Sequence, residues 1–168
     1  MTRKEYARVM QGKRSKAVGA QFERMIETSC EYYKAMGIAA IKKTPEPMKP
    51  IQDLGEGRFK AVYEKKAQPD FKGTLKGGRA ILFDAKHTDS DRIKRDVVSE
   101  EQEKEFNINA IMGAECFVLV SFGFREFYKI PWDIFRNMKE LFGRKYIKPE
   151  EIAEYRVGYA CSIVQFLD

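Results

Sequence analysis

The sequence has few of the residues that build most metal and redox sites. Its 168 residues include one histidine and three cysteines. Cys30, Cys116 and Cys161 are widely spaced in apolar surroundings, without a Cys-x-x-Cys pair, which indicates reduced core thiols and argues against a zinc site. No apolar stretch approaches the ~18 residues of a membrane span, and residues 1–16 lack the apolar segment of a secretion signal. We therefore expect a soluble, cytoplasmic protein with no membrane partner.

The composition is that of a globular chain with an excess of positive charge. Hydrophobic residues make up 43% and charged residues 33% of the sequence, which is enough apolar material for one core. We expect a single domain over residues 1–168. The net charge of +6 favours a polyanionic partner, although this signal alone is weak because many basic proteins bind nothing in particular.

The first part of the chain combines a basic arm, a helix and a segment rich in proline. Residues 1–16 carry many lysines and arginines without an apolar face, and we interpret them as a flexible arm. Apolar residues recur at helical spacing from Ser15 to Met36, with Glu23 on the flank of that stripe. Residues 38–41 read as a buried strand. The prolines and glycines of residues 42–58 exclude a continuous helix and predict a loop or projection.

The rest of the chain alternates between strands and helices. We predict strands over 59–66, 69–75, 79–86, 116–122 and 125–132, with a hairpin turn at Gly77-Gly78. Ser99 and Gln102 form a capping-box pattern that opens a helix. Residues 133–142 and 149–155 are expected to be helical, and residues 159–167 to dock as a last strand or helix. This order predicts an α/β fold, a mixed β-sheet flanked by helices.

The strand over residues 79–86 places chemistry at the edge of an apolar run. Because side chains alternate along a strand, Leu82, Asp84 and Lys86 share one face and His87 points away from it. Two carboxylates such as Asp70 and Asp84 repel each other unless a divalent cation lies between them. Mg²⁺ is held by such carboxylates and at times by a backbone carbonyl, here that of Ala85, and Mn²⁺ can substitute for it. Lys86 would orient or deprotonate a water, or stabilise charge on a phosphate.

A simpler interpretation of the same residues is open. An Asp-x-Lys pair on a strand is usually a solvent-facing ion pair worth ~0.2–1 kcal/mol. The longer phrase favours a site: Pro69-Asp70, a hairpin, an apolar strand and Asp84-Ala85-Lys86 together match the signature of the PD-(D/E)xK nucleases. In that superfamily an acidic residue on a preceding helix, here Glu23, usually accompanies the motif.

More narrowly, the sequence resembles the RecU-type Holliday junction resolvases over about residues 13–131. The resemblance lies in "GAQFERMIETSCEYY" (19–33), "IKKTPEPMKPI" (41–51) and "RFKAVYEKKAQPDFKGTLKGGRAILFDAKHT" (58–88). It implies a homodimeric, Mg²⁺-dependent endonuclease with a restriction-endonuclease-like fold. A stalk between the first two strands, about residues 42–66, would enter the open centre of a four-way DNA junction. Recombination proteins are compatible as further partners, and so are both a cellular and a bacteriophage origin.

Carried over to this chain, the resemblance makes Asp70 and Asp84 metal ligands and Lys86 the catalytic lysine. Gln102 aligns with the glutamine of the helix after the motif, although its capping box explains it without a catalytic role. The chain departs from the family at three positions. Asp84 stands where Glu is common, Glu101 where a His is frequent, and Pro69 where Ser or Thr is usual.

Basic residues of the arm, the projection and the hairpin are candidates for phosphate contacts, as expected for an enzyme that recognises the shape of DNA. The DNA-binding candidates are Arg14, Lys16, Lys42, Lys43, Lys49, Arg58, Lys60, Lys72 and Lys76. Two functions compete with a junction resolvase. One is a non-catalytic nucleic-acid-binding module on a nuclease-like fold, and the other is a nuclease of the same fold that acts on duplex or flapped DNA.

Overall fold

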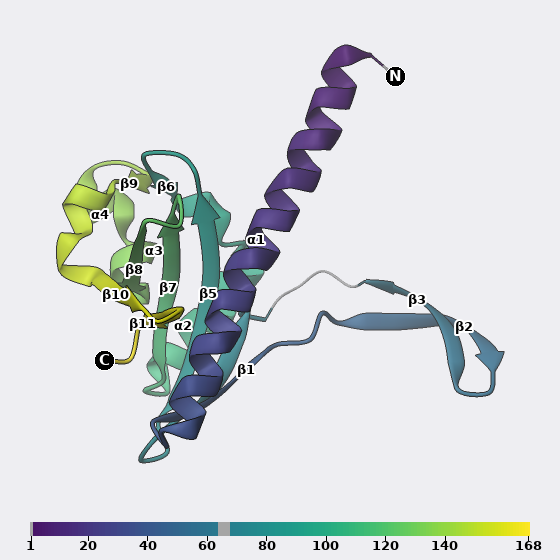
Figure 1. The fold of residues 1–168 in the computed structure, drawn as a ribbon, viewed down its shortest axis with the longest axis horizontal. Helices are drawn as coiled ribbons and strands as arrows, with labels where there is room; N and C mark the ends of the chain where they lie inside the picture. Colours follow the sequence, from purple (N-terminus) through teal and green to yellow (C-terminus); the bar gives the residue numbers. More distant parts are fainter. Residues whose placement is uncertain (1, 64–67) are drawn as a thin grey trace.

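The computed structural model describes residues 2–63 and 68–168, and most of the described chain folds around one mixed β-sheet (Figure 1). Its seven strands lie in the order β1-β4-β5-β7-β8-β10-β11, with β5 and β7 parallel and the other neighbours antiparallel. The strands are β1 (Ala39–Lys43), β4 (Phe71–Leu75), β5 (Ala80–Thr88), β7 (Glu115–Phe122), β8 (Glu126–Pro131), β10 (Arg156–Ala160) and β11 (Ile163–Gln165). The predicted mixed sheet flanked by helices is confirmed.

The other described elements flank this sheet or project from it. Two further strand pairs are β2 (Met48–Gly55) with β3 (Arg58–Tyr63) and β6 (Ile93–Lys94) with β9 (Tyr146–Ile147). The helices are α1 (Arg3–Ala35), α2 (Glu100–Ile111), α3 (Trp132–Arg136) and α4 (Met138–Phe142), with 3-10 turns η1 (Arg95–Val97) and η2 (Pro149–Tyr155). None of the helices within the described ranges is long and apolar enough to cross a membrane.

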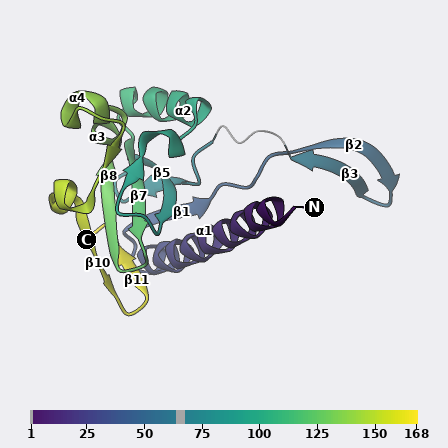
Figure 2. The same cartoon turned by 90° about the horizontal axis from the view of Figure 1, so that it is seen from above.

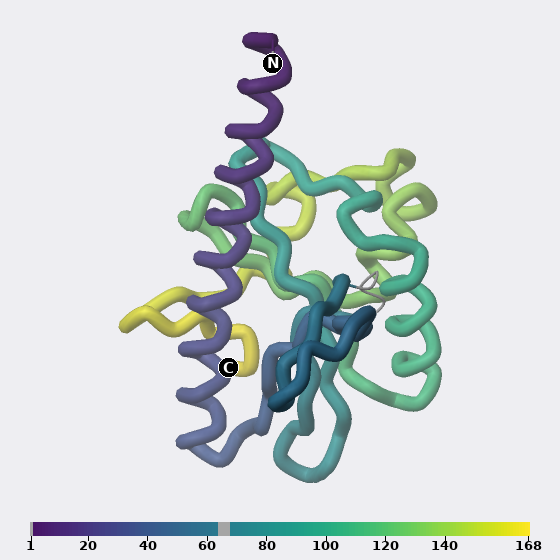
Figure 3. The backbone as a smooth tube through the Cα atoms, turned by 90° about the vertical axis from the view of Figure 1, so that its right-hand side faces the viewer, coloured from purple at the N-terminus to yellow at the C-terminus, as the bar shows by residue number. Residues whose placement is uncertain are grey.

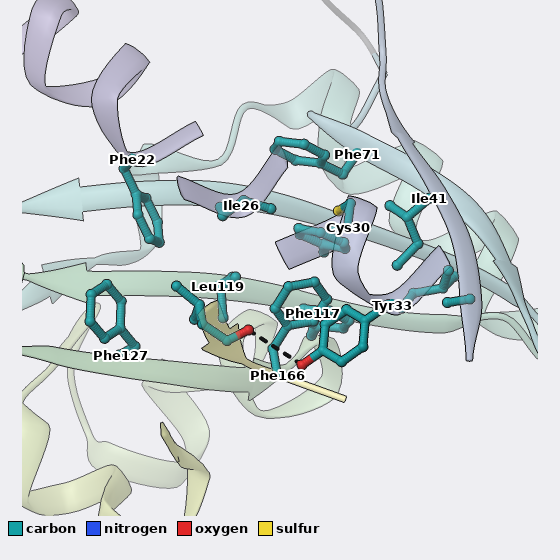
Figure 4. Packing of buried hydrophobic residues seen from close by; sticks show 14 residues of the cluster. Phe22, Ile26, Cys30, Tyr33, Ile41, Phe71, Phe117, Leu119, Phe127 and Phe166 are labelled. Carbon is teal, nitrogen blue, oxygen red and sulfur yellow. Dashed lines mark hydrogen bonds between the residues drawn. The ribbon is translucent and has the colours of Figure 1, made fainter. Parts of the chain in front are cut away.

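Helices cover both faces of the sheet (Figure 2). On one face, α1 packs Phe22, Ile26 and Tyr33 against Phe117 and Leu119 of β7 (Figure 4). These α1 residues lie four and seven positions apart, which are spacings of one helix face, so they form the apolar stripe that the sequence predicted. On the other face, α2 and α3 enclose a second apolar cluster that is separate from the first. The two faces of β5 therefore contact different cores.

The N-terminal segment differs from the prediction made from the sequence. Residues 1–16 were expected to be a flexible arm, but α1 already begins at Arg3. Thr2 and Glu5 form a capping box that satisfies the first free N–H groups. Extending a helix that is already anchored adds a hydrogen bond for each residue, and Lys, Arg, Gln and Met are good helix formers. Helix formation here needs no apolar face, and residues 3–17 are all exposed.

The proline-rich segment forms a projecting β-hairpin rather than a loop. Strands β2 and β3 extend away from the sheet as a stalk, which Figure 1 shows from the side and Figure 3 end-on. Prolines exclude a helix but not a strand in a two-stranded ribbon, where Pro50 pairs with Ala61. The predicted stalk over about 42–66 and strand over 59–66 are described only up to Tyr63, because residues 64–67 lie outside the described ranges.

The C-terminal part differs from the expectation in detail. The helix predicted over 133–142 is two short helices that meet at Asn137, and 149–155 is a 3-10 helix. Residues 159–167 contain a tight hairpin, and its turn residues Cys161 and Ser162 have positive φ angles. Cys161 is therefore an exposed thiol and Cys116 is only half-buried, whereas Cys30 lies in the core. The expectation of three core thiols was wrong for two of them.

Gly73 allows β1 and β4 to approach closely. A Cβ atom at this position would lie 2.1 Å from the carbonyl oxygen of Ala40 and 2.6 Å from the Cα of Ile41. Both neighbours are backbone atoms, which cannot turn away as a side chain can. The glycine three residues after Asp70 is thus required for pairing the strand that follows Asp70 with β1.

We expect Gly73→Ala to lower the free energy of unfolding by about 1–3 kcal/mol, because the added methyl group forces the two strands apart. The measurement is urea denaturation followed by circular dichroism. Gly12→Ala is the matched control: Gly12 lies in exposed helix with no atom near the added Cβ, so this change should raise stability by about 0.5–1 kcal/mol. Equal midpoints for Gly73→Ala and the parent would contradict the close contact.

Candidate metal centre

Two buried carboxylates meet where β4 begins beside β5. Asp70 directly precedes β4, and Asp84 lies in the middle of β5; both side chains are almost completely buried. The N–H of Asp70 donates to Asp84 Oδ1 at 2.9 Å, and the N–H of Ala85 donates to Asp70 Oδ2 at 3.0 Å. Each carboxylate is therefore oriented by the backbone of the other strand. This reciprocal pair of hydrogen bonds fixes the separation of the two acids.

Lys86 joins the two acids, as the strand alternation predicted. Its Nζ lies 3.1 Å from Asp84 Oδ2 and 3.7 Å from Asp70 Oδ2. The approach to Asp84 Oδ2 is an ion pair without hydrogen-bond geometry, because this buried oxygen has no hydrogen-bond partner among the described residues. Two carboxylates and one ammonium leave an excess negative charge in a buried place. Such a site attracts a further cation.

The charges at the site shift one another's protonation. Burial raises the pKa of Asp84, and the nearby charge of Asp70 raises it further, while Lys86 opposes both effects. Burial alone would lower the pKa of Lys86, but the attraction of Asp84 and Asp70 outweighs it and the pKa of Lys86 is raised. Lys86 is thus held as a cation at neutral pH, whereas Asp84 takes up a proton more readily than an exposed aspartate.

The donor set fits a hard divalent cation. Within the described ranges no group of three or more His, Cys, Asp or Glu side chains could hold a metal ion. The available protein ligands are Asp70, Asp84 and the carbonyl of Ala85. Mg²⁺ is typically held by one or two carboxylates and completes its shell with water and substrate oxygens. The unpartnered Oδ2 of Asp84 supplies the oxygen that such an ion requires.

Thr44 is a residue that the sequence analysis did not identify as part of the site. Its N–H donates to the carbonyl of Asp70 at 2.8 Å, and its buried Oγ1 has no hydrogen-bond partner among the described residues. The chain that leaves β1 for the stalk is therefore bonded to the backbone of Asp70. The only sequence signal was the Thr44-Pro45 pair in the RecU-like stretch, which carried no role of its own.

Glu23 and Lys43 pair with each other on the α1 side of the sheet. Glu23 Oε2 lies 2.6 Å from Lys43 Nζ, and this bond raises the pKa of Lys43. Lys43 shares a face of β1 with Ile41, which belongs to the α1 core, whereas Asp84 and Lys86 point to the α2 side. Glu23 therefore does not lie on the face of the sheet that carries Asp84, and Lys43 is ion-paired with the carboxylate of Glu23. Roles of Glu23 in catalysis and of Lys43 in DNA binding stay predictions.

Gln102 lies in the first turn of α2, on the side of the sheet that Asp84 faces. The predicted capping box is confirmed: Gln102 Oε1 accepts from the N–H of Ser99 at 3.1 Å, and the N–H of Gln102 donates to Ser99 Oγ at 3.3 Å. The side chain is buried, and its Oε1 is engaged in the hydrogen bond with the N–H of Ser99. A role of Gln102 at the metal stays a prediction.

His87 turns away from the acids, as predicted. Its Nδ1 lies 3.1 Å from Ser121 Oγ and its Nε2 lies 3.1 Å from Asp89 Oδ1. Its ring stacks on Phe124 at 4.2 Å and faces Phe22 of α1. These contacts place the imidazole on the opposite side of β5 from Lys86.

Two of the basic candidates share the face of the acids. Lys42 pairs with Lys72 across β1 and β4, and Lys72 pairs with Leu82 across β4 and β5. Residues opposite each other in a sheet lie on the same face, so both lysines lie on the face of Asp84 and Lys86. Lys72 Nζ also contacts Gln68 Oε1 at 2.9 Å.

The other basic candidates are more dispersed. Arg14 lines a cavity of about 680 Å³ between α1 and the end of β5, which Lys86 also lines. Lys16 lies about 200° around the helix from Arg14, so it points elsewhere. Lys76 lies beyond the far end of β4, about 20 Å from Asp70 along the strand. Lys49, Arg58 and Lys60 lie on the stalk.

Comparison with known proteins identifies the same family as the sequence motifs. Residues 17–168 match the RecU family, described as recombination protein U. The Holliday junction resolvases RecU of Streptococcus pneumoniae serotype 19F (strain G54) and strain ATCC BAA-255 / R6 are each 30% identical to the chain over 156 residues, covering 84% of it and 74% of their own length. Among solved structures, Hjc of Archaeoglobus fulgidus, a Holliday junction resolvase, is 17% identical with a TM-score of 0.46, over 81% of this chain and 88% of its own.

We expect Mg²⁺ to raise the thermal midpoint of the parent protein, because a ligand that binds only the folded state stabilises it. The rise should be larger near about pH 8 than near about pH 6, since the raised pKa of Asp84 leaves more of it protonated at the lower pH. Asp84→Asn should abolish the rise. Asp96→Asn, an exposed aspartate outside the site, is the control that should keep it. A Mg²⁺ shift that survives in Asp84→Asn would rule out this centre.

Proposed function

Because the chain belongs to the RecU family, we propose that it is a Holliday junction resolvase, an endonuclease that hydrolyses phosphodiester bonds in four-way DNA with the help of Mg²⁺. The observation that carries this proposal is the convergence of Asp70, Asp84 and Lys86. The mixed sheet flanked by helices fits the restriction-endonuclease-like fold of such nucleases. A match to the family over residues 17–168 covers every residue of this site.

Asp70, Asp84 and the carbonyl of Ala85 would hold the metal ion against a phosphate of the substrate. The bound ion supplies Lewis-acid chemistry and a water of lowered pKa. Lys86 acts as a cation in this arrangement, since its raised pKa makes it a poor base at neutral pH. Its ammonium stabilises the charge that develops on the phosphate oxygens. Of the roles open to Lys86 from sequence, electrostatic stabilisation is thus the one that its surroundings favour.

The basic residues suggest how DNA meets this site. Lys42 and Lys72 lie in the row of Leu82, two residues along the strand from Asp84 and on the same face, where they can bind phosphates beside the scissile one. Arg14 borders the cavity at the other side of Lys86. The stalk carries further lysines away from the sheet, in keeping with a protein that recognises the shape of a junction. A homodimer provides two sites related by a two-fold axis, which suits paired nicks on opposing strands.

Two rival functions make different predictions. A non-catalytic binding module would have no reason to keep a buried carboxylate whose pKa burial raises, because such a group costs stability. Retention of both acids and Lys86 favours an active nuclease. A nuclease that acts on duplex or flapped DNA would share the site, so only substrate preference separates it from a resolvase.

We expect Asp84→Asn and Lys86→Ala each to reduce junction cleavage in Mg²⁺ at least about 100-fold, because the first removes a charged ligand of the metal ion and the second removes the ammonium that stabilises charge on the reacting phosphate. Junction binding, measured by gel shift in Ca²⁺, should persist. Lys139→Ala removes an exposed lysine on α4 and should cleave like the parent. Either site variant cutting at the parental rate would show that the assigned residues are wrong.

We also expect the purified protein to nick a synthetic immobile four-way junction on two opposing strands, at symmetric positions near the crossover. Products are mapped on all four strands by end-labelling, with Mg²⁺ or Mn²⁺. A duplex of the same sequence serves as the competitor and should not suppress cleavage at equal concentration. Preferential cleavage of the duplex would favour the second rival, and binding without product in either metal would favour the first.

A further inference from the structure

Thr44 lies in one row of the sheet with the two acids. Its N–H donates to the carbonyl of Asp70 at 2.8 Å, which extends the antiparallel pairing of β1 with β4 by one residue. The pairing of β4 with β5 continues in the same way from Phe71 and Phe83, so that Asp70 stands opposite Asp84. Residues opposite each other in a sheet lie on the same face. Thr44, Asp70 and Asp84 therefore form one row across three neighbouring strands.

The hydroxyl of Thr44 is buried without a hydrogen-bond partner. Thr44 is 4% exposed, and its Oγ1 has no partner among the described residues. The buried hydroxyls of Ser29, Tyr33 and Ser121, by contrast, all contact a polar atom. An unpaired buried group costs free energy, because folding removes its water and returns no bond. The other unpaired oxygen of the row is Asp84 Oδ2. Two such atoms in one row indicate that both serve a ligand.

The local sequence limits the freedom of this side chain. Thr44 precedes Pro45, and a residue before proline is restricted to extended backbone. A β-branched side chain on such a backbone has few allowed χ1 rotamers. Proline also has no N–H that could bond to the hydroxyl. The hydroxyl therefore stays beside Asp70, and little conformational entropy is lost when it forms a bond there.

Asp70 is the member of the row within reach of this hydroxyl. Opposite side chains of neighbouring strands have Cβ atoms about 4.5–5.5 Å apart, which a hydroxyl and a carboxylate can bridge by a hydrogen bond. Lys86 Nζ lies 3.1 Å from Asp84 Oδ2 and 3.7 Å from Asp70 Oδ2, so a divalent ion shared by the two acids competes with the ammonium for these oxygens. A carboxylate that binds a metal ion is usually held by further hydrogen bonds.

We propose that Thr44 is a positioning residue of the metal centre, whose hydroxyl donates to the carboxylate of Asp70 when the two acids bind a divalent cation. This inference rests on the proposed function for the presence of that cation. The hydroxyl touches neither the ion nor the substrate. It fixes the direction in which Asp70 presents its oxygens, and the free energy that the unpaired hydroxyl costs in folding is recovered in metal binding.

The first test is Mn²⁺ binding without DNA, measured from the electron paramagnetic resonance signal of the free ion. Thr44→Val replaces the hydroxyl by a methyl group and should weaken Mn²⁺ binding about tenfold. Thr44→Ser keeps the hydroxyl and should bind Mn²⁺ within about twofold of the parent. Thr74→Val is the matched control. Thr74 is exposed on the same face of β4, four residues from Asp70, so this change should leave Mn²⁺ binding unaltered.

A second measurement separates this role from support of the fold. Because Thr44→Val removes a buried unpaired hydroxyl, the thermal midpoint without added metal should rise by about 2–4 °C. The same variant is thus expected to be more stable and to bind the ion more weakly. A hydroxyl that only supported the fold would lower the midpoint when removed.

Two results would overturn this inference. Parental Mn²⁺ affinity in a Thr44→Val protein that melts at a lower temperature would make Thr44 a structural residue. Parental Mn²⁺ affinity together with slower junction cleavage would assign the hydroxyl to the substrate. Neither result contradicts the proposed function. Weaker Mn²⁺ binding in Thr44→Val, restored in Thr44→Ser, would leave the inference standing even if the parent cleaves no junction, which would refute the proposed function alone.

Discussion

The reciprocal hydrogen bonds that join Asp70 to the carboxylate of Asp84 and to the N–H of Ala85 are the constraint on which the rest depends. The two N–H groups at the start of β4 and in the middle of β5 each hold the carboxylate of the other strand. Neither acid can turn away from the other without leaving a buried N–H unpaired. The acids therefore stay together despite their repulsion, with Lys86 compensating only part of their charge. Burial raises the pKa of Asp84, the charge of Asp70 raises it further, and a divalent cation would relieve both effects.

The site is continuous with the surfaces that would meet a substrate. The N–H of Thr44, at the point where the chain leaves β1 for the stalk, donates to the backbone carbonyl of Asp70. A single hydrogen bond therefore joins the base of the stalk to Asp70. Lys42 and Lys72 extend the same face of the sheet with positive charge. Gly73 lets β1 approach β4 closely enough for this row to form. A junction bound by the stalk would thus be positioned relative to the acids through backbone contacts of a few residues.

Local periodicity predicted the parts of the site that depend on one strand, and it could not predict pairing between distant elements. Alternation alone placed Asp84 and Lys86 together, and helical spacing predicted most of α1. The prediction for residues 1–16 was wrong because it required an apolar face, whereas capping and intrinsic propensity are sufficient to extend an anchored helix. The pairing of Glu23 with Lys43 joins α1 to β1, and the register shifts between β2 and β3 leave no clear sequence signal.

The most direct test of the central claim is the position of a bound metal ion. Crystals of the protein grown with Mn²⁺ and no DNA would show it by anomalous diffraction. We predict one strong peak within about 2.0–2.3 Å of a carboxylate oxygen of both Asp70 and Asp84, with further contacts to water or the Ala85 carbonyl. A peak elsewhere in the molecule at saturating Mn²⁺, with Asp84 Oδ2 still paired only with Lys86, would contradict the assignment of these two acids as the metal site.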